Sequence, residues 1–263
     1  MICRSMRKSR RFNKIRASLF VFASIYSFDM ALPFFFHEDL SEKTLFLSFP
    51  DETSRHIVQV LRLKTGDPLE ITDGKGNSAR AEITEDNKKK CSCKIIAFHR
   101  HARRSESIAI AISPVKNNGR FEWFLEKATE IGVSEIIPLV CERTEKTHPR
   151  FDRMQNILVS AMLQSQQSWL PELKKPEAFE NLVRSASHSQ KFIAHCATED
   201  RIPLKQAIHA GGSRIILVGP EGDFTKPEID LSIQCHFTAV SLGDTRLRTE
   251  TAGIVAATLL TSY

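Results

Sequence analysis

The sequence predicts an α/β protein with a parallel sheet in its C-terminal part, preceded by a small domain built mainly of β-strands. Three observations lead to this prediction. From residue 108 onward, short apolar runs typical of buried strands alternate with helical patterns. Before residue 101, strand patterns dominate. Near the C-terminal end, two strands each run into a glycine-bearing loop followed by a helix signal. By pattern alone, the larger domain is Rossmann-like.

The N-terminal part is predicted to be a small β-barrel with one helix. Its strands are expected at residues 34–36, 44–49, 69–72, 79–83 and 91–98. The sequence Asp-Gly-Lys-Gly at residues 73–76 indicates a hairpin turn between the third and fourth strands. Residues 51–63 fit a helix because Ile57, Val60 and Leu61 recur at helical spacing.

The C-terminal part is predicted to alternate strands and helices. Strands are expected at residues 108–113, 136–140, 192–196, 215–218 and 239–242. Helices are expected at residues 121–131, 151–165 and 203–209, then after Thr225 and over the apolar segment 252–260. Gly132 ends the first of these helices. Such alternation is typical of a parallel sheet with covering helices.

The first glycine-bearing loop reads Leu-Val-Gly-Pro-Glu-Gly-Asp-Phe-Thr at residues 217–225. Gly222 suits a positive φ or a close approach of the backbone to a ligand. Thr225 and Glu228 form a capping-box pattern that starts the next helix. Backbone amides near a helix N-terminus favour a polar or anionic ligand group. Taken alone, the loop is equally typical of an ordinary βα turn.

The second loop, at residues 242–252, makes a ligand site more probable than the first loop does alone. Arg246 and Arg248 stand two residues apart in a small, polar stretch. Thr249 is expected to cap the final helix, and Glu250 falls in its first turn, where a carboxylate suits the helix dipole. A surface ion pair between Arg248 and Glu250 is the competing interpretation, but residues two apart on a helix do not face each other.

Four segments together resemble the RsmE family of ribosomal RNA methyltransferases in the SPOUT superfamily. Two are the loops themselves, with Gly-Pro-Glu-Gly at residues 219–222 and Leu-Arg-Thr-Glu-Thr-Ala at residues 247–252. The third runs from Arg120 through Lys-Ala-Thr-Glu-Ile-Gly to Thr144, and a weaker one spans residues 153–171. The resemblance covers about residues 31–263.

The chain departs from the usual family pattern at three places. The family usually has a second glycine where Asp223 stands, and Arg-Ile where Thr245 and Arg246 stand. It usually has small residues where Met162 and Leu163 stand. These departures affect loop shape or a single RNA contact and leave the frame of the site intact.

The resemblance implies a fold and a domain division. Residues 105–263 would form a SPOUT methyltransferase domain, with a parallel sheet and a trefoil knot, that pairs as a homodimer. Residues 31–101 would form a PUA-like β-barrel that binds RNA. Residues 1–30 lie outside the resemblance; their basic start and short apolar run suggest a disordered tail or a mis-assigned start codon.

The resemblance also implies an activity, namely S-adenosylmethionine-dependent methylation of N3 of a specific uridine in 16S ribosomal RNA of the small subunit. Backbone of the two loops would bind the cofactor at Leu217, Val218, Gly219, Pro220, Glu221, Gly222, Ser241, Leu242, Gly243 and Leu247. Uracil N3–H is a weak acid, so the enzyme must accept its proton or stabilise the anion. Arg248 and Arg143 are candidates for anion stabilisation, and Glu250 or Glu221 for proton acceptance.

The charge distribution limits where RNA could bind. The net charge is +6, but residues 1–30 hold seven bases and one acid, which leaves 30 bases and 30 acids elsewhere. RNA contacts must therefore come from local patches, although each patch could also be ordinary solvated surface. The candidate RNA-binding residues are Arg55, Arg62, Arg103, Arg104 and Arg120.

The spacing of the cysteines, the length of the apolar runs and the motifs present limit the cellular compartment and the alternative functions. The six cysteines include no Cys-x-x-Cys pair, which argues against a metal site or a disulfide framework and for a reducing cytoplasm. No apolar run is long enough to span a membrane. A non-catalytic RNA-binding assembly factor is the alternative that Asp223 and Thr245 would favour. A dehydrogenase is remote, because no G-x-G-x-x-G motif opens the first strand.

Overall fold

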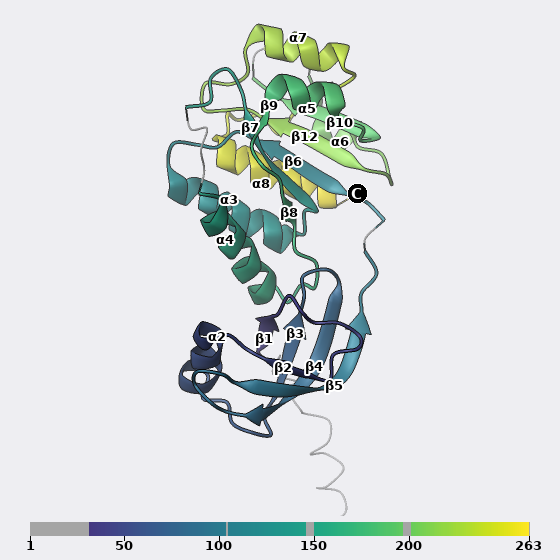
Figure 1. Cartoon of the computed structure of the whole chain (residues 1–263). Helices are drawn as coiled ribbons and strands as arrows, with labels where there is room; N and C mark the ends of the chain where they lie inside the picture. Colours follow the sequence, from purple (N-terminus) through teal and green to yellow (C-terminus); the bar gives the residue numbers. More distant parts are fainter. Residues whose placement is uncertain (1–31, 104, 146–149, 197–200, 263) are drawn as a thin grey trace, which may run out of the picture. The chain divides into compact units, whose positions relative to one another are not determined.

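The computed structural model describes residues 32–103, 105–145, 150–196 and 201–262 (Figure 1). Within them, Phe34–Tyr263 forms one compact unit that contains two sheets. The predicted extension over residues 1–30 lies outside the described residues. None of the described helices has both the length and the apolar character needed to cross a bilayer.

The first sheet has five strands in the order β1-β3-β4-β5-β2. They are β1 (Phe34–Phe36), β2 (Phe46–Ser48), β3 (Pro68–Thr72), β4 (Asn77–Glu85) and β5 (Ser92–Arg100). The predicted hairpin joins β3 to β4, and the Asp73 carboxylate accepts hydrogen bonds from the backbone N–H of Lys75 (2.7 Å) and Asn77 (3.1 Å). This sheet therefore follows the sequence pattern closely.

The first sheet curls into a half-barrel, in agreement with the small β-barrel that the sequence predicts. β1 and β2 are its edges, and no strand pairing among the described residues joins them. The curl still brings the two edges together, since His37 Nε2 lies 3.2 Å from the Ser48 carbonyl oxygen. Cys91 and Cys93 are buried inside, where burial raises the pKa of their thiols to about 11 and about 12. These thiols pack rather than react.

The helix predicted over residues 51–63 is shorter and changes its winding. It consists of α2 (Asp51–Arg55) followed by a π-helical turn, η1 (His56–Val60). A π turn is wider than an α turn, so the 3.6-residue spacing no longer holds along it. Ile57 is buried as predicted, but Val60 and Leu61 are exposed.

The second sheet is parallel throughout, which confirms the predicted α/β class. Its order is β11-β13-β10-β12-β6-β7-β8, and β9 also pairs with β7. The predicted strands are β6 (Ile108–Ile112), β7 (Glu135–Val140), β10 (Gln190–Ala194), β12 (Arg214–Val218) and β13 (Thr238–Ser241). Three two-residue strands lack a sequence signal: β8 (Glu172–Leu173), β9 (Glu177–Ala178) and β11 (Ile202–Pro203). The trefoil knot stays a prediction.

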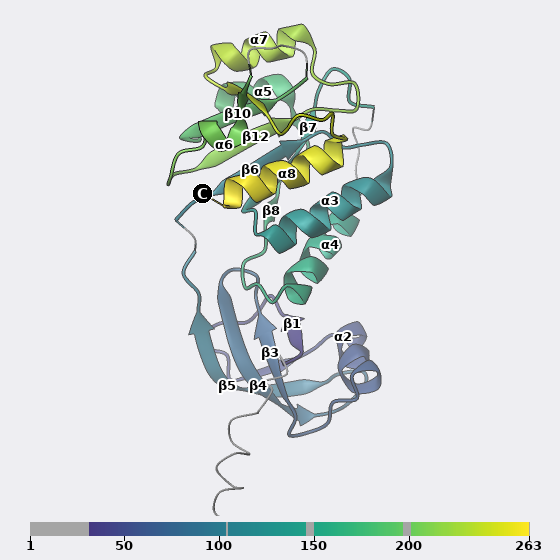
Figure 2. The same cartoon turned by 180° about the vertical axis from the view of Figure 1, so that it is seen from behind.

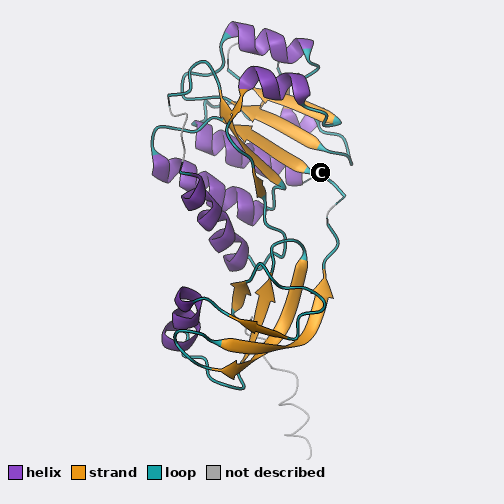
Figure 3. Ribbon diagram, in the orientation of Figure 1, coloured by secondary structure: helices purple, strands orange, loops and turns teal. Residues whose placement is uncertain are grey.

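Helices cover both faces of the parallel sheet (Figures 2 and 3). One face packs against α3 (Asn118–Ile131), α4 (Phe151–Gln164), α6 (Leu204–Ala207) and α8 (Thr249–Thr261). The other packs against α5 (Phe179–Ser185), which the sequence pattern missed, and α7 (Lys226–Gln234).

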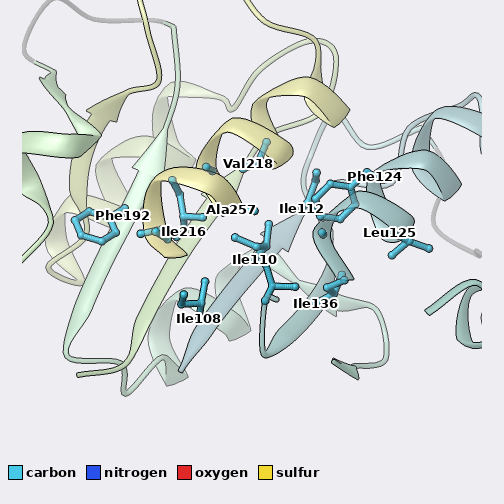
Figure 4. Packing of buried hydrophobic residues seen from close by; sticks show 14 of the residues in the cluster. Ile108, Ile110, Ile112, Phe124, Leu125, Ile136, Phe192, Ile216, Val218 and Ala257 are labelled. Atoms are coloured by element: carbon cyan, nitrogen blue, oxygen red, sulfur yellow. The ribbon is translucent and has the colours of Figure 1, made fainter. Parts of the chain in front are cut away.

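The strand residues of the parallel sheet divide between the two faces by simple alternation. Ile108, Ile110 and Ile112 of β6 belong to the core under α3 and α8 (Figure 4), whereas Ala109 and Ala111 belong to the opposite core. A sheet buried on both faces needs continuous apolar strands, which is why these runs were readable in the sequence.

Arg214 is a charged residue in this apolar setting, and replacing it is expected to destabilise the protein. It is fully buried at the start of β12, and its guanidinium donates to the carbonyls of Leu260 (2.6 Å) and His209 (2.9 Å). Arg214→Met would leave both carbonyls without these donors, so we expect a loss of about 2–4 kcal/mol in the free energy of unfolding. Urea denaturation would measure it. Arg214→Lys, which can reach one carbonyl, should lose less, and an unchanged midpoint for Arg214→Met would contradict the prediction.

Candidate active site

A cavity of about 340 Å³ opens at the carboxyl ends of three adjacent strands, β10, β12 and β13. This volume lies in the range of small-molecule sites, and ligands of open α/β sheets bind outside the carboxyl ends of strands. Its floor includes Ala194, Val218 and Val240, which are neighbours across the sheet. The two glycine-bearing loops form much of its wall.

The first loop ends in the predicted capping box. The Glu228 carboxylate accepts the backbone N–H of Thr225 (2.8 Å) and its hydroxyl (3.0 Å). The second oxygen of the same carboxylate accepts the backbone N–H of Glu142 (2.9 Å). Glu228 is buried, so it fixes the loop after β7, which carries Arg143, to the start of α7.

The left-handed backbone position of the first loop is Asp223 (φ +62°), not Gly222, which corrects the prediction made for that glycine. Asp223 tolerates this conformation because its short carboxylate accepts the backbone N–H of Phe224 (2.9 Å) and of Cys196 (2.8 Å). Gly222 is needed for space instead. A Cβ there would lie 3.3 Å from Arg143 Cδ, and the Gly222 carbonyl accepts Arg143 Nη1 at 2.6 Å.

Thr249 of the second loop was predicted to cap the final helix, but in the structure it binds the first loop. The N-cap of α8 is Arg248 rather than the predicted Thr249. The buried Thr249 hydroxyl donates to the Gly219 carbonyl (3.0 Å), which joins two loops thirty residues apart. Gly243 has φ +151°, a conformation that side chains rarely adopt, and it faces open space at the cavity wall.

The structure brings most of the predicted cofactor-binding residues together. Those that line the cavity are Val218, Gly219, Pro220, Glu221, Leu242, Gly243 and Leu247. Leu217, Gly222 and Ser241 do not line it. Leu217 is one residue from Val218 on β12, so its side chain points into the opposite core.

Three of the four candidate catalytic residues, Arg248, Glu250 and Arg143, occupy different places. Arg248 lines the cavity and also an adjoining shallow groove formed with Arg120, Trp123, Glu250 and others. Glu250 lines only the groove, and its Oε2 is buried without a partner among the described residues. Arg143 lines neither and binds Gly222 instead.

The shallow groove is polar at its base and carries an exposed aromatic side chain. Arg120 Nη1 and Nε lie 3.8 Å from Glu221 Oε1 and Glu250 Oε1, respectively. Trp123 is 44% exposed on the same helix, α3. Exposed aromatic rings are typical surfaces for stacking RNA bases.

Among the described residues, no direct contact joins the predicted RNA-binding residues to one another. Arg55 is paired with Asp51 (2.8 Å), and Arg62 adopts a left-handed backbone at the end of the π turn. Arg103 lies over the Trp169 ring, 5.4 Å from its centroid. Arg104 lies outside the described residues. Arg120 belongs to the groove.

Sequence reasoning missed one wall of the cavity. The missed lining residues are Ala194, His195, Cys196, Arg201, Asp223, Val240, Thr249 and Ala252. A strand was predicted through residue 196, but its place between β12 and β13 depends on sheet order, which has no local signal. His195 is 4% exposed, and burial lowers the pKa of its imidazole despite the opposing charge of Asp223.

Each of the two parts of the chain matches the model of a known protein family. A family model described as RNA methyltransferase domain matches residues 103–261, and one described as RNA methyltransferase PUA domain matches residues 49–96. Ribosomal RNA small subunit methyltransferase E from Synechocystis sp. is 31% identical over 218 residues, 76% of this chain and 68% of that protein.

Solved structures agree with these matches. A probable rRNA-methyltransferase from Porphyromonas gingivalis superposes with a TM-score of 0.82 at 34% identity, covering 88% of this chain and 98% of that chain. Ribosomal RNA small subunit methyltransferase E from Neisseria gonorrhoeae, bound to S-adenosyl methionine, gives a TM-score of 0.77 at 26% identity, covering 88% and 97%.

Proposed function

Because the chain belongs to the RsmE family of ribosomal RNA small subunit methyltransferases, we propose that it methylates N3 of a specific uridine in 16S ribosomal RNA. It is an RNA methyltransferase that uses S-adenosylmethionine. The observation that carries the proposal is the junction of the two signature loops, held by Thr249 and Gly219, around one cavity. The assembly-factor alternative has no comparable support.

The cavity suits S-adenosylmethionine in size and in polar groups. Bound there, the cofactor supplies an electrophilic methyl group on a sulfonium. Val218, Val240 and Leu242 offer apolar surface for a nucleoside, and backbone of Gly219 and Gly243 can approach a ligand closely. The carboxylate of Glu221 and the guanidinium of Arg246 can pair with the charged ends of an amino-acid group.

The adjoining groove is proposed to hold the uridine. Arg248 lines both the cavity and the groove, so its guanidinium can stabilise negative charge that develops on the uracil as N3 loses its proton. The Oε2 of Glu250, which has no partner in the described part of the chain, can accept that proton. Trp123 offers a ring on which the base can stack. Arg143 acts through Gly222, by fixing the first loop.

The proposal also covers the RNA contacts, the roles of the two domains, the oligomeric state and the cellular compartment. Arg55, Arg62, Arg103 and Arg104 would contact the ribosomal RNA backbone, and Arg120 would act at the groove. The β-sheet part, residues 31–101, would serve as the RNA-binding domain and residues 105–263 as the catalytic one. A cytoplasmic homodimer with the SPOUT knot follows from the family.

A direct test combines ligand binding with RNA chemistry. Isothermal titration of the full chain with S-adenosylmethionine should show binding, and NAD should show none. Incubating the enzyme with small subunits from a strain lacking this gene should produce N3-methyluridine, detected by mass spectrometry of nucleosides. Gly222→Val should weaken both results, because a Cβ at residue 222 already lies 3.3 Å from Arg143 Cδ and the added methyl groups displace the Arg143 side chain that holds the loop. Binding without any methyl transfer would instead favour the assembly-factor alternative.

A further inference from the structure

His195 is a polar side chain that the activity described above leaves unexplained. It directly follows β10, the strand that lies between β12 and β13, and it lines the cavity. It is 4% exposed, and neither ring nitrogen has a hydrogen-bond partner among the described residues. Burying an unpartnered polar group is costly, so such a group at a ligand cavity is expected to gain its partner from the ligand.

The backbone on both sides of His195 is fixed. The His195 carbonyl accepts Arg201 Nη1 at 2.6 Å, and the next N–H, that of Cys196, donates to Asp223 Oδ2 at 2.8 Å. Asp223 holds a left-handed backbone conformation to make this contact. The backbone at His195, a residue that lines the cavity, is therefore held by a side-chain contact that a glycine at residue 223 could not make.

The distribution of charge around the cavity indicates which part of a ligand His195 meets. The preceding residue Ala194 and its strand partners Val218 and Val240 are apolar, whereas Arg246 and Arg248 come from the second loop. The charged groups of Arg201 and Asp223 are engaged by the backbone of residues 195 and 196. A neutral imidazole offers one N–H donor and one acceptor nitrogen. That pair complements the hydroxyls or the base edge of a nucleoside better than a carboxylate or an ammonium group.

We propose that His195 is a cofactor-binding residue that hydrogen-bonds the nucleoside part of S-adenosylmethionine, and that Asp223 and Arg201 position it. The inference rests on the proposed function, because it takes the methyl donor as the ligand. It assigns a side-chain contact to a site whose other ligand groups are largely backbone.

The test is titration of the full chain with S-adenosylmethionine, S-adenosylhomocysteine and 5′-methylthioadenosine, the last of which lacks the amino-acid group. His195→Leu should weaken all three by the same factor, roughly three- to tenfold for one neutral hydrogen bond. His195→Asn, which keeps a donor and an acceptor, should recover part of the loss. Asp223→Gly should also weaken binding, although it relieves the left-handed backbone.

His188 provides a matched control. Its Nδ1 is also buried without a partner among the described residues, but it does not line the cavity. His188→Leu should leave all three affinities unchanged. A second readout excludes a structural role for His195: without ligand, His195→Leu should unfold at the same or a higher temperature than wild type, because it removes an unpaired buried polar group.

The outcomes separate this inference from the proposed function. Wild type that binds no S-adenosylmethionine would overturn both. Wild type that binds it, with His195→Leu equal to wild type, would overturn only the role of His195. A loss confined to the two amino-acid-bearing ligands would overturn the nucleoside assignment. A lowered unfolding temperature in His195→Leu without ligand would mark the residue as structural and overturn the inference.

Discussion

Replacing Arg248 by alanine is expected to slow methyl transfer by about 10²–10³-fold, the usual effect of removing a group that stabilises charge in a transition state. Arg248 is exposed and makes no capping bond, so the unfolding temperature should change little. The loss should fall on kcat rather than on the affinity for the methyl donor, because the negative charge appears only as uracil N3 loses its proton. Single-turnover transfer of a labelled methyl group to small subunits measures it.

Arg246→Ala is the matched control for Arg248. Arg246 is also exposed and lies two residues earlier, but it lines only the cavity and not the groove. It should lose less than tenfold in rate, mainly through cofactor affinity. Arg248→Lys keeps the charge without the planar fork and should fall between wild type and Arg248→Ala. If Arg248→Ala turns over within threefold of wild type, the anion-stabilising role is wrong.

Gly253→Ala is expected to destabilise the protein by about 1–3 kcal/mol, the cost of overpacking a well-filled core. An added Cβ would lie 2.6 Å from Phe124 Cε2 and 2.7 Å from Ile112 Cδ1, two side chains in the core shown in Figure 4. Helix propensity alone would predict the opposite, a gain of up to about 1 kcal/mol for alanine over glycine. Gly253→Val should cost more still. Thermal or urea denaturation measures the change.

Gly119 supplies the comparison for Gly253. It also lies in a helix, α3, but a Cβ there would meet only Asn117 Oδ1, at 3.4 Å. Gly119→Ala should therefore be neutral or stabilising. Equal stabilisation by both substitutions would show that α8 does not pack as closely on α3 and β6 as the structure indicates.

The parts of the site that could be predicted are those set by residues a few positions apart along the chain. The capping box of Thr225 and Glu228 and the glycine at residue 243 are local, and local geometry followed them. The role of Thr249 was not predictable, because its partner Gly219 lies thirty residues away. The same reason explains why the role of Arg143 was not predicted. Its guanidinium binds the carbonyl of a distant loop and does not line the cavity.

The fold likewise contains elements that could be predicted from the sequence and elements that could not. Continuous apolar runs identified the long buried strands, since a sheet covered on both faces leaves such runs in the sequence. Two-residue strands such as β8 and β11 have too few residues to show a period. The π-helical turn after Arg55 has no sequence period of its own, so Val60 and Leu61 were placed wrongly. His195 escaped notice because strand order, which places the strand before it between β12 and β13, is a tertiary property.

The buried carboxylate of Glu228 has a consequence for native-state hydrogen exchange. It holds the amide of Glu142 and the amide of Thr225, while the hydroxyl of Thr249 holds the carbonyl of Gly219. Three segments far apart along the chain are thereby fastened at one end of the sheet. None can open to solvent without breaking a bond to another, so their amides should exchange as a single cooperative unit. A ligand that touches any one of them would slow exchange in all three.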